Sequence, residues 1–333
     1  MHKGGQYIWN EMPNENKKIL FSMYHKQKVK DPYLQDYEEL KEIIHKKFPK
    51  QTATFQFYFK AFILILSTLY VDFWMDYGYG MAFIRGILYA LVGFNISHDA
   101  NHSAISDDWR VNYIFSFTAD YGGISSFLWR LHHNYGHHVN TNNRNDPDYV
   151  VIFPVKKYQN IWLWFLLPFL AVKDHISQLY DLMLKRYKDE RGRRVGLLWM
   201  VVFWVRFYGI PLYNDIWNIR WIMLTNVVLG VYAGFFFLLS HHFEGNRPNC
   251  RTTWMRDQVE NSSNVGGRWL CFINGGLNYQ IEHHLFPRVC HTYYPELSEV
   301  VRGYCEEKGI GYRHFGSIME NFVSTCKSMK KMN

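Results

Sequence analysis

Residues 219–240 read IRWIMLTNVVLGVYAGFFFLLS and are followed directly by His241 and His242. About 20 mostly apolar residues in one helix are enough to cross the hydrocarbon core of a bilayer. Arg85 and Arg206 lie within two further runs of this kind, so we expect their side chains to face protein rather than lipid. The sequence therefore predicts an all-α membrane protein with four transmembrane helices, at about residues 56–76, 79–97, 195–213 and 219–240.

The positive charges predict how these spans are oriented. A short turn near residues 77–79 joins the first two spans and residues 212–218, LYNDIWN, join the last two, and neither turn contains Lys or Arg. Lys and Arg concentrate instead in the N-terminal arm, in the loop between the second and third spans, and in the C-terminal tail. Because Lys- and Arg-rich loops stay in the cytosol, we expect two hairpins with both termini and the central loop cytosolic.

The remaining segments are assigned by their composition. Residues 31–48 are predicted to form an amphipathic helix, and the apolar runs near residues 110–128 and 158–172, which are short or interrupted, to form interfacial or re-entrant helices. The expected parts of the chain are a basic N-terminal arm (1–53), a membrane domain (54–315) whose cytosolic helical cap comes from residues 98–194 and 241–315, and a tail (316–333).

The composition argues against several classes of protein. Hydrophobic residues make up 48% of the 333 residues and aromatic residues 18%, which is too apolar for a disordered chain. The net charge of +8 would suit nucleic acid, but topology already explains the basic loops, so we expect a membrane and no nucleic acid. Five Cys without a CxxC pair argue against a disulfide framework and a zinc ribbon. No cleavable signal peptide is expected, and Lys330-Lys331 resembles a dilysine signal of endoplasmic-reticulum membrane proteins.

Histidine clusters indicate the chemistry. Ten of the 16 His fall into four short clusters, each just beyond a predicted span on the same side of the membrane. His98 and His102, and again His133 and His137, are four residues apart, so on a helix each pair shares a face. Imidazoles favour Fe, Zn, Cu or Ni over Mg or Ca. About eight imidazoles exceed the four ligands of one tetrahedral zinc, so two metals are expected.

Three segments carry a resemblance to a known family. HDANHSAIS (98–106), HNYGHHVNTNNRNDPDY (133–149) and LNYQIEHHLFPRVCHTYYPELSEVV (277–301) resemble the three histidine boxes of the integral-membrane fatty acid desaturase superfamily, over about residues 55–315. The similarity is closest to the branch in which Gln opens the third box, which includes front-end and other acyl-lipid or acyl-CoA desaturases. The resemblance implies a di-iron centre.

The resemblance also implies which residues bind metal. The expected ligands are His98, His102, His133, His137, His138, His241, His283 and His284. His241 is favoured over His242 because it stands three residues before Glu244, and His132 matches no family ligand. Gln280 stands where other branches have His, so it is expected to bind directly, through water, or not at all. Residues expected to orient the imidazoles, with helix capping or surface charge as the alternative, are Asp99, Asn134, Asp146, Asp148, Glu244, Asn278 and Glu282.

The expected reaction follows from the same resemblance. Family members introduce a cis double bond into an acyl chain, using O2 and two electrons. No HPGG haem motif occurs in the sequence, so we expect a separate electron donor, cytochrome b5 with its reductase or alternatively a ferredoxin.

Other functions remain as alternatives. Hydroxylases, acetylenases and sphingolipid desaturases use the same boxes. A metal transporter would need ionisable residues along a path through the spans, whereas these histidines lie outside them. A zinc-dependent lipid hydrolase would need only about three ligands, which leaves most of the histidines unexplained.

Overall fold

A computed structural model describes residues 14, 17–18, 32–148, 157–248 and 252–331, and these are mostly helical. Four helical segments are long and apolar enough to cross a membrane, as the sequence predicts. They are α4 (Phe55–Trp74); α5 (Tyr79–Val92) with η2 (Gly93–Ser97) and α6 (His98–Asn101); α13 (Glu190–Phe203) with η6 (Trp204–Gly209) and α14 (Ile210–Asn214); and η7 (Ile216–Asn218) with α15 (Ile219–His241).

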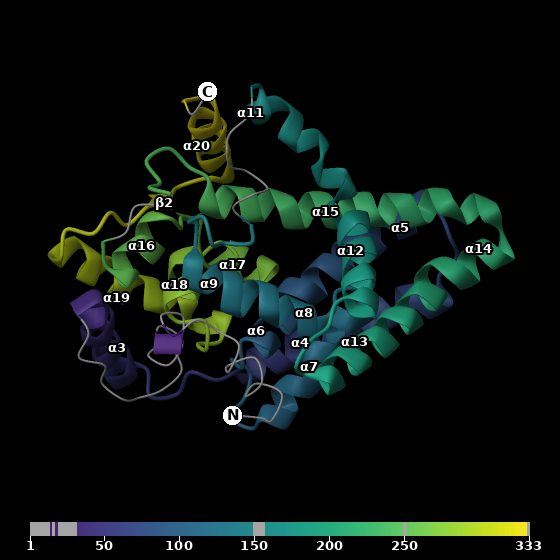
Figure 1. Ribbon diagram of the computed structural model, residues 1–333, viewed down its shortest axis with the longest axis horizontal. Helices are drawn as coiled ribbons and strands as arrows, with labels where there is room; N and C mark the ends of the chain where they lie inside the picture. The colour runs from purple at the N-terminus through teal and green to yellow at the C-terminus, as the bar shows by residue number, and fades with distance from the viewer. Residues whose placement is uncertain (1–13, 15–16, 19–31, 149–156, 249–251, 332–333) are drawn as a thin grey trace.

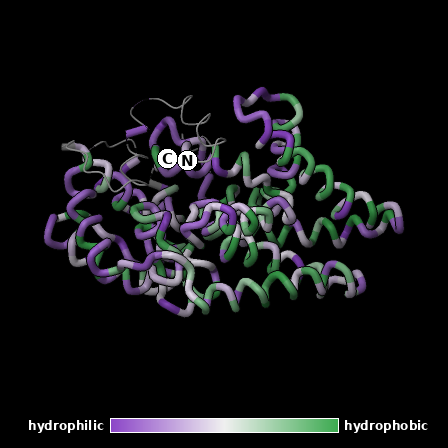
Figure 2. The backbone as a smooth tube through the Cα atoms, turned by 90° about the horizontal axis from the view of Figure 1, so that it is seen from below, coloured by the Kyte–Doolittle hydropathy of each residue, from purple (hydrophilic) through white to green (hydrophobic). Residues whose placement is uncertain are grey.

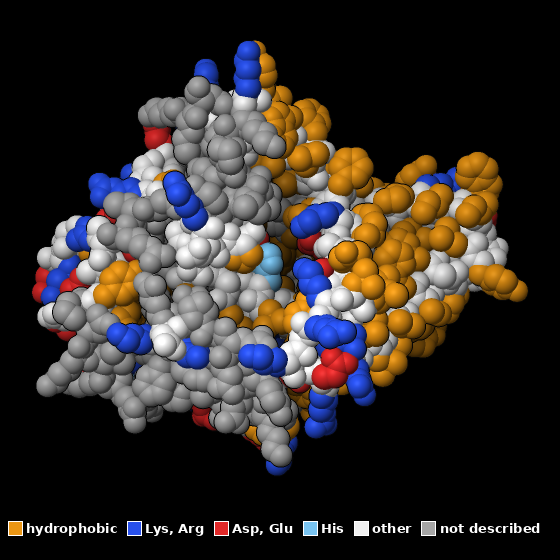
Figure 3. Space-filling view, viewed as in Figure 1, with side chains coloured by type: hydrophobic (Ala, Val, Ile, Leu, Met, Phe, Trp, Pro, Cys, Tyr) orange, Lys and Arg blue, Asp and Glu red, His pale blue; other side chains and the backbone are white. Residues whose placement is uncertain are grey.

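The spans lie together at one side of the molecule and the cap at the other (Figure 1). The residues of the spans are mostly hydrophobic and those of the cap mostly hydrophilic (Figure 2). Hydrophobic side chains gather over the spans, whereas charged side chains lie mainly over the cap and its junction with the spans (Figure 3). The expected fold class, an all-α membrane protein with a helical cap, is confirmed.

Glycines let α15 approach its neighbours closely. A Cβ atom at Gly86 of α5 would lie 2.7 Å from the Val228 Cβ of α15, and one at Gly230 would lie 2.5 Å from the Leu167 carbonyl oxygen. Small residues are the usual means of close helix packing in membranes, where lipid offers no hydrophobic drive for association. Helix α15 therefore packs closely on α5 and on the segment that contains Leu167. Helix α5 also packs against α4.

The second expected hairpin is open rather than closely paired. Helices α13 and α15 converge at the turn that joins them and separate toward the cap (Figure 1). Helix α12 (Leu170–Leu184), which the sequence analysis does not assign to a span, packs against both of them. The packing of α15 on α5 and the insertion of α12 together account for the separation.

Three charged residues of the spans, Asp72, Arg85 and Arg206, lie together and face protein, as expected for the two arginines. The Asp72 carboxylate of α4 accepts hydrogen bonds from Arg85 Nε and Arg206 Nη1, each at 2.8 Å. The hydroxyls of Tyr89 and Tyr121 donate to the same carboxylate at 2.8 and 2.6 Å. One buried carboxylate thus joins α4, α5, η6 and α7 (Trp109–Tyr121), which is the arrangement that intramembrane charges require.

The two other apolar runs form short helices. The first contains α7 and α8 (Ser126–Trp129). The second contains α11 (Gln159–Trp162), η4 (Leu163–Phe165), η5 (Leu167–Phe169) and the start of α12, with exposed apolar side chains at Ile161, Phe165, Leu166 and Phe169. None of these elements is long enough to span a bilayer, and their interfacial or re-entrant placement stays a prediction.

The N-terminal amphipathic helix is present and joins the cap. Helix α3 (Gln35–Lys47) buries Tyr37, Leu40 and Ile44 in a core that includes Trp254 and Tyr294. Residues 35–47 of the expected N-terminal arm are therefore integrated in the cap.

Besides the segment between the second and third spans, the cap draws on the C-terminal third. This C-terminal part consists of α16 (Trp254–Glu260), α17 (Arg268–Asn274), α18 (Gln280–Leu285), η8 (His291–Tyr293), α19 (Tyr294–Glu307) and the parallel pair β1 (Asn264–Val265) and β2 (His314–Phe315). Helix α20 (Ile318–Lys331) follows β2 and packs on α11 and α15. The expected dilysine signal lies at its end, where Lys330 is exposed and the side chain of Lys331 lies outside the described residues.

Candidate metal centre

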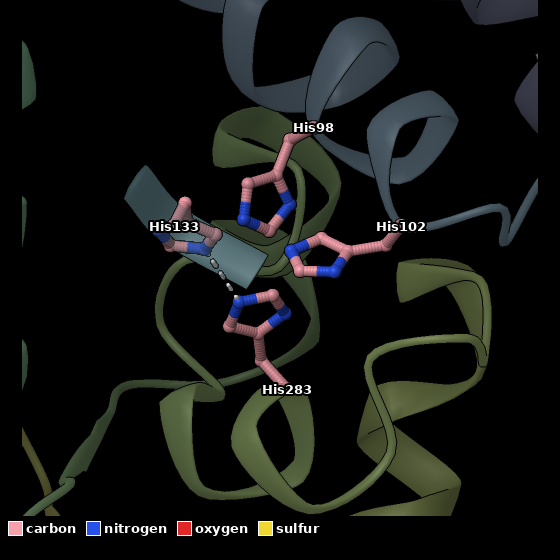
Figure 4. Close-up of side chains that lie close together, drawn as sticks. All are labelled: His98, His102, His133 and His283. Atoms are coloured by element: carbon pink, nitrogen blue, oxygen red, sulfur yellow. Dashed lines mark hydrogen bonds between the residues drawn. The ribbon is translucent and has the colours of Figure 1, made fainter. Parts of the chain in front are cut away.

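Four histidines from three separate segments form the first group. His98 begins α6, His102 follows it, His133 lies in η3 (Arg130–His137), and His283 lies in α18. Each offers a ring nitrogen, and these four nitrogens lie within 4.8 Å of one another. Figure 4 shows the four imidazoles converging from different directions on one point. This convergence is the arrangement expected of metal ligands.

A second group lies beside the first. Ring nitrogens of His137, His241 and His284 also lie within 4.8 Å of one another. His138 belongs to α9 (His138–Asn140) and lies between the groups: its Nε2 is 2.9 Å from that of His283 in the first group, and its ring centroid is 4.4 Å from that of His284 in the second. The structure therefore brings all eight histidines expected as ligands to one place.

The neighbouring histidines lie outside both groups. The His132 side chain is 51% exposed and pairs with Asp148 at 2.8 Å. His242 is buried but contributes to neither group. His241 belongs to the second group, and the assignment of His241 rather than His242 as a ligand stays a prediction that a metal-bound structure would test.

Two π-helical segments help to place these histidines. Segment η2 immediately precedes His98, and η3 contains His133 and His137. Such segments are rare and occur frequently at functional sites. His98 and His102 share a group, whereas His133 and His137, at the same spacing, belong to different groups. The i,i+4 spacing therefore predicts that two histidines lie close together, but not whether they belong to the same group.

The histidine nitrogens have the properties that a metal ion requires. Both ring nitrogens of His102, and the Nε2 atoms of His137 and His284, are buried without a hydrogen-bond partner in the described residues. The Nε2 atoms of His133 and His138 lie only 3.0 Å apart. A cation between such nitrogens would use their lone pairs and remove the cost of burying them unpaired.

Burial also keeps these imidazoles in the form that binds metal. It lowers the pKa of His102, His133, His138, His283 and His284 well below the ordinary value. Because these rings are then neutral at pH 7, their nitrogen lone pairs are available. The residues present therefore fit a pair of transition-metal ions.

Two of the expected orienting carboxylates contact a ligand. The Asp146 carboxylate lies 3.0 Å from His137 Nδ1, and that of Asp148 lies 3.6 Å from the same atom. Burial acts to lower the pKa of His137, but Asp146 and Asp148 together outweigh burial and the net pKa is raised. An Nδ1–H donated to Asp146 leaves the Nε2 lone pair of His137 facing the second group.

The other expected orienting residues have different partners. Asp99 lies 2.8 Å from His291 Nδ1, but 3.9 Å from His98 Nδ1. Glu282 accepts hydrogen bonds from Asn264 and Tyr312, and Asn278 donates to the carbonyls of Val265 and Gly267. Asn134 donates to the carbonyl of Asn101, and the backbone N–H of Glu244 donates to Ser324 Oγ.

Gln280 contacts the second group directly. Its Nε2 lies 3.1 Å from His241 Nε2, and its Oε1 is buried without a partner in the described residues. The carbonyl of Asn261 lies 3.1 Å from His241 Nδ1, so it accepts that N–H and leaves the Nε2 lone pair of His241 toward Gln280. The contact keeps Gln280 among the residues that can bind metal directly or through water.

Several further residues contact the Nδ1 atoms of the histidines, and the sequence gives no signal for them. Gln258 Oε1 lies 2.9 Å from His284 Nδ1, and Thr141 Oγ1 lies 3.1 Å from the same nitrogen while donating to Gln258. Tyr294 lies 3.3 Å from His283 Nδ1, and Asn261 contacts His241. Gln258 and Asn261 precede the third box by about 20 residues, so no local spacing signals their role.

Replacing Gln258 with Leu is expected to weaken metal binding about 10- to 100-fold, since outer hydrogen-bond partners of ligating histidines typically contribute this much. The variant removes the acceptor that fixes Nδ1–H on His284, whereas Gln258→Glu keeps an acceptor there and serves as the matched control. Metal retained after dialysis against graded chelator concentrations measures the effect. Equal retention by Gln258→Leu and wild type would show that this contact does not orient His284.

The fold and the centre together define a four-span membrane protein with a buried, histidine-rich metal-binding site. Residues 72–316 match the family model described as fatty acid desaturase. The chain is 34% identical to the acyl-lipid (7-3)-desaturase of Rebecca salina over 88% of this chain and 74% of that protein. It is 34% identical to the acyl-lipid (7-3)-desaturase of Diacronema lutheri over 74% of this chain and 62% of that protein. It is 27% identical to the sn-1 linoleoyl-lipid 6-desaturase of Synechocystis sp. over 75% of this chain and 79% of that protein.

The chain belongs to the fatty acid desaturase family. The resemblance of its three histidine boxes to this family is thus confirmed. It is an integral membrane oxidoreductase of lipid metabolism, a fatty acid desaturase with a lipid substrate.

Proposed function

We propose that this protein is a di-iron desaturase that introduces a cis double bond into the acyl chain of a lipid, with O2 as cosubstrate. The observation that carries the proposal is the pair of adjoining groups, one with four histidine nitrogens and one with three, with His138 between them. Two ions side by side explain why eight imidazoles gather in one place, seven of them buried and His133 partly buried, when one tetrahedral ion needs four ligands.

The residues of the chain have distinct roles in this proposal. His98, His102, His133 and His283 hold one ion, His137, His241 and His284 hold the other, and His138 lies within reach of both. Bound iron would supply the O2 chemistry that removes two hydrogens from an unactivated chain, which no side chain can do. Asp146, Gln258 and Asn261 keep three imidazoles in the tautomer that directs Nε2 inward. The burial of seven of these eight imidazoles limits the access of water to the reaction.

The substrate proposal draws on the relatives. The three relatives are named as acyl-lipid or linoleoyl-lipid desaturases, and Gln280 opens the third box here. We therefore place this chain with the acyl-lipid desaturases of front-end type, with an acyl-CoA carrier as the alternative that product analysis decides.

The electrons must come from outside these 333 residues, which contain no HPGG haem motif. Cytochrome b5 with its reductase is the donor we propose, and a ferredoxin is the alternative. We also propose that both termini are cytosolic, because Lys and Arg gather on the histidine side. We propose residence in the endoplasmic reticulum because Lys330-Lys331 resembles a dilysine signal.

Expression in a yeast, followed by gas chromatography–mass spectrometry of its fatty acids, tests the proposed reaction. Wild-type protein is expected to produce a new unsaturated species, absent with an equally expressed His283→Ala variant, and the double-bond position gives the regiochemistry. Candidate acyl chains are supplied in the medium, and cytochrome b5 is co-expressed. A hydroxylated or acetylenic product would contradict the desaturation step, and no new lipid under any of these conditions would contradict the function proposed.

A further inference from the structure

The short cap helix α17 exposes an apolar face to its surroundings. Trp269 is 80% exposed and Ile273, one turn later, is 53% exposed, with Phe272 between them. Residues three and four apart in a helix lie on one face. The opposite face carries Cys271, which is buried in the core of the cap. One face of α17 is therefore packed in the cap, while the opposite face presents apolar side chains outward.

Helix α17 lies at the ends of two spans. Lys60 of α4 donates to the Phe272 carbonyl at 3.0 Å, and its ammonium lies 4.8 Å from the centre of the Phe272 ring. Asn95 of η2, at the end of the second span, donates to the Ile273 carbonyl at 3.0 Å. These contacts fix α17 on the histidine side of α4 and α5, where Figure 1 places it between the spans and α18.

The lipid-facing surface of α4 continues toward this helix. Phe59, Phe62 and Ile63 are exposed on α4 within one turn of Lys60. An exposed Trp beside the end of a transmembrane helix is typical of the boundary between headgroups and acyl chains. Arg268 precedes Trp269 and pairs with Glu296 at 2.7 Å, so a charged rim borders the apolar face on the cap side.

We propose that α17 is an interfacial helix whose side chains Trp269, Phe272 and Ile273 insert into the leaflet on the histidine side of the membrane. We assign lipid as the occupant of this face, because Lys60 joins α17 to the part of α4 where Phe62 and Ile63 are exposed, on a helix long and apolar enough to cross a membrane. The helix leads within six residues to Gln280 and the third histidine box. Insertion of α17 therefore holds that box at the membrane boundary, where lipid acyl chains lie.

Nitroxide labelling in lipid nanodiscs tests this proposal. Cysteine is introduced at Trp269 and, separately, at Ile273, and the label's exposure to O2 is compared with its exposure to a water-soluble nickel chelate. Phe62→Cys serves as the lipid-facing control and Glu307→Cys, exposed at the end of α19, as the water-facing control. Unsubstituted protein gives the background from native cysteines.

Both α17 positions are expected to show an O2-to-nickel ratio several times that of Glu307→Cys and close to that of Phe62→Cys. Ratios equal to that of Glu307→Cys would show that α17 lies in water and would overturn the proposal. Shielding from both reagents would overturn it as well, because the face would then be covered by protein such as a second copy. The two positions are exposed and tested separately, so a folding defect in one variant leaves the other as the test.

Discussion

His133→Ala is expected to reduce desaturation to the background of cells without the protein, whereas His132→Ala should keep it within about twofold of wild type, as exposed substitutions usually do. The two residues are adjacent and undergo the same chemical change. His133 Nε2 lies 3.0 Å from that of His138 and 3.4 Å from that of His283, inside the first histidine group. The His132 side chain points outward and pairs with Asp148. The fatty acid profile at matched expression measures both variants.

The two outcomes together locate the metal centre. Metal content of the purified variants provides a second measurement, and we expect His133→Ala to lose metal and His132→Ala to keep it. Wild-type activity in His133→Ala would contradict the assignment of the first group. An equal loss of desaturation and metal in both variants would contradict the assignment of His133 as a ligand and of His132 as a residue outside the centre.

Asp72→Ala is expected to destabilise the spans by about 3–5 kcal/mol, the usual cost of removing one partner from a buried ion pair. The Asp72 side chain is 4% exposed and accepts from two arginines and two tyrosines. Its removal leaves Arg85 and Arg206 as buried positive charges without a carboxylate. The change is measured by heating the protein in detergent and recording, by size-exclusion chromatography, the temperature at which the monodisperse peak is lost.

Asp76→Ala is the matched control for this experiment. Asp76 lies four residues further along, in the exposed turn between α4 and α5, and its replacement should change stability by no more than about 0.5 kcal/mol. If Asp72→Ala unfolded at the same temperature as Asp76→Ala, the carboxylate would not be what joins these spans.

The sequence predicts the parts of the structure that depend on local pattern. Span length and apolar content determine where α4, α5, α13 and α15 lie, because a bilayer imposes both on any helix that crosses it. The histidine boxes are equally local, and His241 lies in the second group whereas His242 lies in neither. Arg85 and Arg206 face protein because lipid cannot solvate them.

Features that depend on tertiary packing could not be predicted in this way. Nothing in the spacing of His133 and His137 shows that they join different groups, since this depends on where His283 and His284 meet them. Gln258 reaches His284 only because α16 packs against α18. The insertion of α12 between α13 and α15, and the docking of α3 in the cap, likewise depend on surfaces brought together by folding.

Metal stoichiometry of the purified protein tests the two-metal centre most directly. Protein produced in iron-replete cells, purified in mild detergent and analysed by inductively coupled plasma mass spectrometry should contain two metal ions per chain, with iron predominant. His133→Ala, which removes a ligand of one group only, should contain fewer. A folded wild-type chain that holds a single ion or none after reconstitution with iron would contradict the two adjoining sites proposed for these eight histidines.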